Sequence, residues 1–261
     1  MAVVNRPDDL VGTWIEAFAS TSTGWDFSSL SGAMDEPEPP WSFDRLSVDA
    51  LAGDDSALDM GTGGGEQLIR LVEALRSRGL RCPALVATEG WPPNVPVATA
   101  NLAPYGIPVQ VYDADTGERM PFCDESFAVV LNRHEAYSPT EVHRVLRPQG
   151  RFLTQQVGSL DARETTDWFG RHARPEWTLD RASTTLQDAG LTVVAADDFV
   201  GAYRFDSVTT LLRYFALVPW DLPDGFAVTD HLPALTALHL GVEAGKPVEL
   251  TLHRWYVEAR R

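Results

Sequence analysis

The chain has 261 residues, 44% of them hydrophobic, and carries 37 acidic side chains against 21 lysines and arginines, a formal net charge of −16. This length can bury a large α/β core without disulfide bonds or structural metal ions, and the charge disfavours nucleic acid as a partner. No apolar run is long enough to span a membrane and the amino-terminal segment lacks a signal-peptide pattern, so we expect a cytoplasmic protein.

The first 50 residues differ in composition from the rest, and we expect them to form a lid or cap segment. Helical spacing over residues 8–20 places four apolar side chains on one face: Leu10, Trp14, Ala17 and Phe18. Residues 21–46 are rich in serine, glycine and proline, yet they also hold Trp25, Phe27, Trp41 and Phe43. A simple linker would not contain so many large apolar groups.

From residue 55 onward, short apolar runs alternate with segments of helical spacing. The expected strands are 56–60, 84–89, 109–115, 127–135 and 151–158, and the expected helices are 65–79, 94–106 and 139–150. Continuous apolar runs are typical of strands buried on both faces. Their alternation with helices indicates a doubly wound parallel sheet. In the first helix, four leucine and valine residues mark the expected buried side: Leu68, Leu71, Val72 and Leu75.

The carboxy-terminal part is less regular. Helices are expected at 180–190 and 207–220, and strands at 191–205 and 248–261. We therefore expect residues 51–261 to form one core domain, with 200–247 inserted into it.

The sequence ALDMGTGGGEQL at 57–68 is the strongest ligand-binding signal. Gly61, Gly63 and Gly65 directly follow a strand, where glycine allows positive φ and a close approach to a ligand. The dinucleotide fingerprint GxGxxG would require glycine at 66, but Glu66 stands there and would repel a pyrophosphate. A GxxxxGK[ST] phosphate loop is also missing from the sequence. The pattern indicates a nucleoside-like ligand without a phosphate chain.

Acidic side chains end three successive strands. Asp59 ends the first, Glu89 the second, and Asp113 and Asp115 the third. Ligands of open parallel sheets bind at these carboxyl ends. Carboxylates there could accept hydrogen bonds from an amino group, a ribose diol and an exocyclic amine, and S-adenosylmethionine carries all three.

Residues 55–157 resemble the class I S-adenosylmethionine-dependent methyltransferases. The similarity is greatest to a bacterial small-molecule branch with the motifs LDMGTGGGE, NRHEAY and RFLTQQVG. MPFCDESFAVVLNRHE resembles the family's LPF-x-D-x-SFD segment, although Ala128 replaces the usual aspartate. The resemblance implies a Rossmann-like sheet, mostly parallel with an antiparallel last strand, together with an amino-terminal helical lid and a carboxy-terminal substrate-pocket insertion.

The resemblance also implies S-adenosylmethionine as cofactor, S-adenosylhomocysteine as product and no metal ion. The implied binding set places Asp59, Gly61, Gly63 and Gly65 around the methionine part, Glu89 at the ribose hydroxyls and Asp113 at the adenine. Thr62, Asp115 and Asn132 complete the set, and the sequence does not separate Asp113 from Asp115.

His134 and Glu135 follow the fourth strand and are the candidate catalytic residues. Methyl transfer from a sulfonium is an in-line displacement, so the protein mainly aligns donor and acceptor. A base is needed only where the acceptor loses a proton. His134, with an ordinary pKa of about 6.5, suits that task, and a structural role is the alternative. We expect Glu135 to orient His134 or Arg133.

Insertions outside the core generally supply the acceptor pocket in this fold, and the tryptophans and tyrosines there could enclose an aromatic acceptor. The expected substrate contacts are Trp14, Trp25, Trp41, Gln156, Tyr203, Tyr214 and Trp220, with core packing as the alternative for at least half of the aromatic residues. The expected function is methylation of a small aromatic or heteroaromatic metabolite, such as an indole, by a monomer or homodimer. The alternatives are RNA methylation and non-catalytic cofactor binding; the net charge argues against the first and the intact glycine loop against the second.

Overall fold

The computed structural model describes residues 7–20, 28–171 and 176–261. The chain divides into two compact units. Unit 1 consists of Met1–Glu38, Ser159–Pro175 and Val200–His253, and unit 2 of Pro39–Gly158, Glu176–Phe199 and Arg254–Arg261. The chain therefore passes from one unit to the other five times, after residues 38, 158, 175, 199 and 253. These bounds differ from the division at residue 50 expected from the sequence, and a lid role for the first 50 residues stays a prediction.

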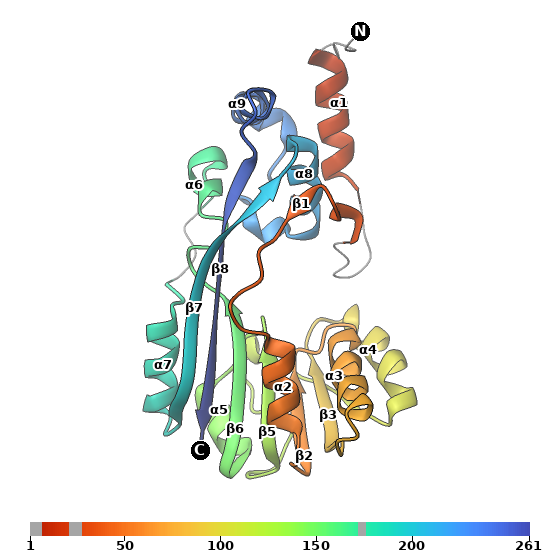
Figure 1. Ribbon diagram of the computed structural model, residues 1–261, viewed down its shortest axis with the longest axis vertical. Helices are drawn as coiled ribbons and strands as arrows, with labels where there is room; N and C mark the ends of the chain where they lie inside the picture. The colour runs from red at the N-terminus through yellow and green to blue at the C-terminus, as the bar shows by residue number, and fades with distance from the viewer. Residues whose placement is uncertain (1–6, 21–27, 172–175) are drawn as a thin grey trace. The chain divides into compact units, whose positions relative to one another are not determined.

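The described residues form an eight-stranded sheet with the order β1-β7-β8-β6-β5-β2-β3-β4 (Figure 1). The strands are β1 (Met34–Asp35), β2 (Ser56–Met60), β3 (Ala84–Glu89), β4 (Val109–Val111), β5 (Phe127–Arg133), β6 (Leu146–Val157), β7 (Thr192–Phe205) and β8 (Val248–Arg260). Neighbours among β2 to β6 are parallel, whereas β8 runs antiparallel to β6. The expected Rossmann-like sheet, mostly parallel with an antiparallel last strand, is confirmed.

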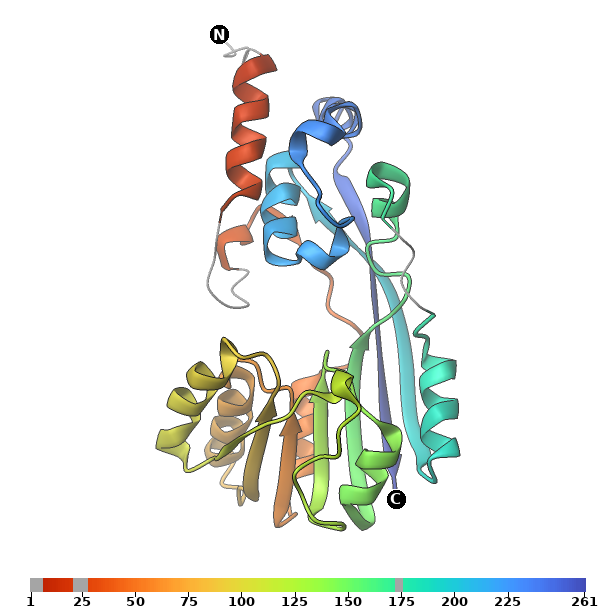
Figure 2. The ribbon, with the colours of Figure 1, turned by 180° about the vertical axis from the view of Figure 1, so that it is seen from behind.

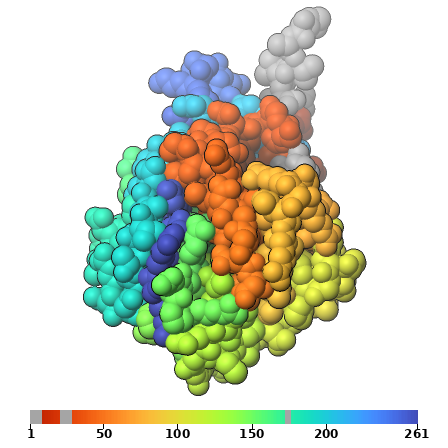
Figure 3. Space-filling model, turned by 60° about the horizontal axis from the view of Figure 1, so that its bottom comes forward, coloured from red at the N-terminus to blue at the C-terminus, as the bar shows by residue number. Residues whose placement is uncertain are grey.

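In unit 2, helices cover both faces of this sheet. One face packs against α2 (Phe43–Leu51), α3 (Glu66–Ser77) and the end of α4 (Asn94–Leu102), and α2 and α3 lie side by side in Figure 3. The opposite face packs against α5 (Pro139–Val145) and α7 (Leu179–Asp188), which Figure 2 shows from behind. Neighbouring residues of β2 alternate between the two cores, because Ala57 belongs to the first and Leu58 to the second.

The glycine turn leads directly into α3, and this helix buries the expected side. Its buried residues are Leu68, Leu71, Val72 and Leu75, each at most 2% exposed. Their spacing of three, one and three residues keeps them on one face of the helix. The packing of this face against the sheet fixes the direction in which the turn faces.

Several expected elements end earlier than the sequence suggested, and two of them do so for a clear local reason. The helix expected over 139–150 ends at Val145, because Pro148 lacks an N–H and disfavours helical geometry at Arg147, and the chain joins β6 instead. The strand expected over 109–115 ends at Val111. Asp113 then caps the short helix η3 (Ala114–Thr116), where its carboxylate accepts a 2.9 Å hydrogen bond from the Asp115 N–H.

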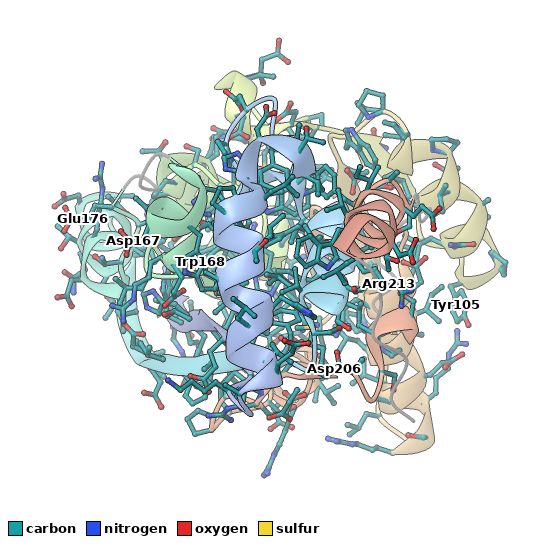
Figure 4. The ribbon with its side chains drawn as sticks, turned by 90° about the horizontal axis from the view of Figure 1, so that it is seen from above. Tyr105, Asp167, Trp168, Glu176, Asp206 and Arg213 are labelled. Carbon is teal, nitrogen blue, oxygen red and sulfur yellow. The ribbon has the colours of Figure 1, made fainter. Side chains whose placement is uncertain are left out.

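Unit 1 contains α1 (Pro7–Phe18), α6 (Glu164–Phe169), α8 (Val208–Leu217) and α9 (Leu232–Glu243). The remaining short helices are η1 (Ser28–Leu30), η4 (Pro219–Asp221) and η5 (Val228–His231) in unit 1 and η2 (Ala103–Tyr105) in unit 2. On α8, Arg213 is exposed (Figure 4), while the other face of the helix is buried. A membrane-crossing helix would need more length and apolar character than any helix of the described segments has.

Candidate cofactor site

A turn of glycines joins β2 to α3. Gly61, Gly63 and Gly65 have φ angles of +65°, +61° and +87°, in the left-handed region that favours glycine. A Cβ on Gly61 would lie 2.3 Å from the Cγ of Glu135, and one on Gly65 would lie 2.8 Å from the Cγ of Leu102. At Gly63, no atom of the described residues lies within 4 Å of the Cβ position. The backbone at Gly63 is therefore open to a ligand.

The tip of β3 holds this turn. The Thr62 N–H donates to the Thr88 carbonyl oxygen at 2.9 Å, and the Gly63 N–H donates to Glu89 Oε2 at 2.7 Å. Glu89 is only 4% exposed. Its carboxylate therefore fixes the loop, and its expected contact with ribose hydroxyls stays a prediction. Sequence reasoning missed Thr88, because a threonine inside a strand gives no signal that it supports a neighbouring turn.

The ends of β3 and β4 approach each other closely. A Cβ on Gly90 would lie 2.8 Å from the Asp113 Cα, so a larger residue would push the two strand ends apart. The backbone N–H of Trp91 donates to Glu89 Oε1 at 2.8 Å, and Trp91 is 57% exposed. Asp113 and Asp115 are both exposed, and nothing in their hydrogen bonding favours either one as the adenine contact. Gly90 and Trp91 were not among the expected site residues.

Three carboxyl groups gather around the turn. Burial raises the pKa of Asp59 to about 6; the Thr62 hydroxyl opposes this shift and the charge of Glu89 adds to it. Burial also raises the pKa of Glu135 to about 7, with further contributions from the charges of Glu89, Asp115 and Asp113. Raised carboxyl pKa values mean that the negative charge here lacks compensation. A cationic ligand would compensate this negative charge.

His134 directly follows β5 in a left-handed conformation, with φ of +59°. Its N–H donates to the Gln155 carbonyl oxygen at 2.8 Å. Although the residue is exposed, desolvation by neighbouring protein groups, followed by the positive charges of Arg254 and Arg133, lowers the pKa of His134 well below its ordinary value. The ring is therefore neutral near pH 7, and a base role for His134 stays a prediction.

A buried amide network supports the backbone at Glu135. The side chain of Asn132, which is fully buried, accepts hydrogen bonds from Thr154 Oγ1 at 2.8 Å and Gln156 Nε2 at 2.6 Å. Gln156 Nε2 also donates to the Glu135 carbonyl oxygen at 2.9 Å. Within the described residues, the Asn132 amide nitrogen has no hydrogen-bond partner. Cofactor contact by Asn132 and substrate contact by Gln156 stay predictions.

Trp41 and Arg133 are engaged within unit 2. Trp41 Nε1 donates to Gln155 Oε1 at 2.8 Å, and its ring lies 5.0 Å from that of Tyr256. Arg133 lies 3.6 Å from the Asp44 carboxylate. This ion pair is half-exposed.

The other expected substrate contacts lie in unit 1 or outside the described residues. Trp14, Tyr203 and Tyr214 are 1%, 2% and 4% exposed, which agrees with the core-packing alternative. Trp14 makes an edge contact with His239, and the Tyr203 and Tyr214 rings lie 5.4 Å apart. Trp220 is 52% exposed, and Trp25 falls outside the described residues. Substrate contact by any of these five residues stays a prediction.

Comparison with known proteins finds a methyltransferase domain in this chain. Residues 58–154 match the sequence model of the methyltransferase domain family. An uncharacterised protein of Escherichia coli strain K12, YafS, is 28% identical over 153 residues; the match covers 59% of this chain and 62% of that protein. The chain thus spans less than two thirds of this relative's length.

Solved structures show the same fold at low sequence identity. A putative methyltransferase from Bacillus halodurans is 18% identical, with a TM-score of 0.58 over 84% of this chain and 98% of that one. The YcgJ protein of Bacillus subtilis is also 18% identical, with a TM-score of 0.57 over 84% of this chain and 97% of that one. The domain match, the sheet order and the glycine turn agree with one another. Residues 58–154 therefore match a methyltransferase domain, and the sheet of the described residues has the Rossmann-like fold of these solved structures.

Proposed function

We propose that this protein transfers the methyl group of S-adenosylmethionine to a small aromatic or heteroaromatic metabolite, for example an indole-like ring. The observation that carries the proposal is the pair of carboxyl groups with raised pKa values, Asp59 and Glu135, near the bare backbone of Gly63. A phosphate-bearing ligand would be repelled there, whereas a sulfonium or ammonium group would be attracted.

The residues at the site fit S-adenosylmethionine. The open backbone at Gly63 gives room for the methionine part, and Asp59 and Glu135 suit its cationic groups. Glu89 retains acceptor capacity beyond its two backbone hydrogen bonds, which suits a ribose hydroxyl. The exposed Trp91 ring and the acids at η3 suit an adenine. When bound, the cofactor supplies an activated methyl group on a sulfonium.

A small acceptor is supported by the charge of the whole chain. At −16, the protein repels phosphodiester backbones, so RNA is the weaker alternative. The third candidate, a non-catalytic cofactor-binding protein, requires that the site bind the cofactor without turnover. A proton-bearing acceptor would need a base, for which His134 and Glu135 are the two candidates.

Calorimetry and mass spectrometry test this function together. The purified protein should bind S-adenosylmethionine and S-adenosylhomocysteine, and it should add 14 mass units (one methylene) to at least one member of a panel of indoles, phenols and aromatic amines. Asp59→Ala should weaken binding of the cofactor, with the exposed Asp188→Ala as matched control. Absence of binding by the folded wild type would reject the assignment. Binding without transfer to any acceptor would favour the non-catalytic alternative.

A further inference from the structure

The Glu135 side chain lies directly against the glycine turn. A Cβ on Gly61 would meet three of its atoms, the Cγ at 2.3 Å, the Cβ at 2.6 Å and Oε2 at 2.7 Å. The Glu135 carboxylate therefore lies beside Gly61, which is two residues from the open position at Gly63. Glu135 is thus part of the surface that a ligand on this turn would meet.

The Glu135 carboxylate has no basic partner. Apart from the Ala136 N–H, no hydrogen-bond donor or cation among residues 7–20, 28–171 and 176–261 contacts it. Glu89 differs, because two backbone N–H groups occupy its carboxylate. Among the acids at the turn, Glu135 is therefore well placed to take up a proton or to face a cationic ligand.

Three acidic groups have the largest electrostatic influence on this carboxyl group. Glu89 at the end of β3, and Asp115 and Asp113 at η3, disfavour its ionised form. Asp59 at the end of β2 belongs to the same cluster through Glu89. The nearest arginine in sequence, Arg133, is paired with Asp44.

His134 is the poorer proton acceptor of the two candidates. Desolvation, followed by the positive charges of Arg254 and Arg133, disfavours protonation of its ring. Desolvation, followed by the negative charges of Glu89, Asp115 and Asp113, favours protonation of Glu135. A base works best when its proton affinity is near that set by the working pH, and burial among acids brings Glu135 to a pKa of about 7.

We propose that Glu135 is the catalytic proton acceptor of this methyltransferase and that its ionisation is coupled to the positive charge of the cofactor. In the step, a lone or π electron pair of the acceptor forms the bond to the methyl carbon. The carbon–sulfur bond breaks with its electron pair on sulfur, and the acceptor's proton moves to the Glu135 carboxylate. The site holds a cationic donor and a carboxylate before the step, and a neutral product and a carboxylic acid after it, so charge is balanced. The inference rests on the proposed function.

Proton-linked calorimetry tests the coupling without turnover. Wild-type protein is titrated near pH 7 with S-adenosylmethionine or S-adenosylhomocysteine, in buffers of different ionisation enthalpy. Because Glu135 is about half protonated there, the cationic ligand should release about 0.5 proton more per site than the neutral one. From about pH 6 to pH 8, the ratio of the two affinities should rise about tenfold in favour of S-adenosylmethionine.

Two substitutions show which residue is responsible for the difference in proton release. Glu135→Gln keeps the side chain's shape and should abolish the difference in proton release, whereas His134→Gln should retain it. A difference that persists in Glu135→Gln, or disappears only in His134→Gln, would overturn the proposal. If Glu135→Gln does not fold, a wild-type affinity ratio that stays flat over this pH range would overturn it equally. Failure of the wild type to bind either ligand would instead reject the proposed function.

Discussion

At the scale of single residues, the variant Gly63→Ala should have two effects that can be measured separately, backbone strain and exclusion of a ligand. A methyl group there meets no atom of the described residues, so Gly63→Ala should cost only about 1 kcal/mol of stability through its positive φ. The same methyl would occupy the space at the turn that a cofactor needs. We expect the dissociation constant for S-adenosylhomocysteine to rise about tenfold or more, measured by calorimetry.

Gly79 provides the matched control, because it has φ of +67° and equally open surroundings at the other end of α3. Gly79→Ala should lose similar stability in urea denaturation and bind the cofactor normally. Equal affinities of the two variants would mean that the turn is not the binding surface.

Glu135 should make the ligand-free protein less stable as the pH rises. Its pKa is about 7 in the folded chain and 4.5 in an ordinary setting, so the folded state holds a proton that the unfolded state has lost between these values. The contribution of Glu135 to the free energy of unfolding is therefore fully present below about pH 4.5 and is lost as the pH rises through 7. Glu135→Gln mimics the protonated form, and it should be more stable than wild type by about 1–2 kcal/mol at pH 8, a value reduced for the partial exposure of the site.

Urea denaturation at pH 5 and pH 8 measures this effect. The advantage of Glu135→Gln should be small at pH 5, and the exposed Glu118→Gln should show none at either pH. An advantage that does not change with pH would arise from packing rather than ionisation.

Some site residues could be read from the sequence and others could not. Asp59, Glu89 and the three glycines stand at strand ends, and the sequence alone locates these ends. Position 90 requires glycine because a Cβ there would collide with the backbone of Asp113. Asp113 is more than twenty positions away, so only the folded chain reveals this contact. The lowered pKa of His134 likewise depends on desolvation in the folded chain and then on the charge of Arg254 in β8, near the end of the chain.

At the scale of elements, the tips of β5 and β6 depend on one buried amide. Gln156 Nε2 donates to the side chain of Asn132 and to the carbonyl oxygen of Glu135. Gln156→Leu leaves both buried acceptors without this donor, so stability should fall by about 1–3 kcal/mol in thermal or urea denaturation. Cofactor affinity should fall as well, since the backbone of Glu135 loses its support.

Gln187→Leu on the exposed side of α7 is the comparison, and it should change stability by no more than about 0.5 kcal/mol. If both variants behave alike, the amide network does not hold the strand tips.

Periodicity predicted elements well where one packing partner dominates. The four residues expected to be buried on α3 are buried, because this helix lies against a single sheet face. Periodicity did not predict where two elements end. Pro148 ends the helix expected over 139–150, and the helix cap at Asp113 ends the strand expected over 109–115. In unit 1, the helices α6 and α9 were not predicted from the sequence.

At the scale of the whole molecule, the charge of −16 yields a test of the acceptor class. A protein that methylates RNA needs a basic surface, and its binding weakens steeply with salt. We expect this protein to pass through a heparin column at about 50 mM salt without retention. Strong retention, released only by high salt, would favour the RNA alternative.

The repeated passage of the chain between its units also limits how the protein can be rebuilt. Two of the five crossings fall inside strands, within β7 and within β8, where no loop offers a place to cut or join. A chimera made at one gene junction would therefore interrupt both units, and a relative's unit 1 cannot be transplanted as one block. Diversification of such a scaffold should accordingly proceed by point changes rather than by recombination of modules.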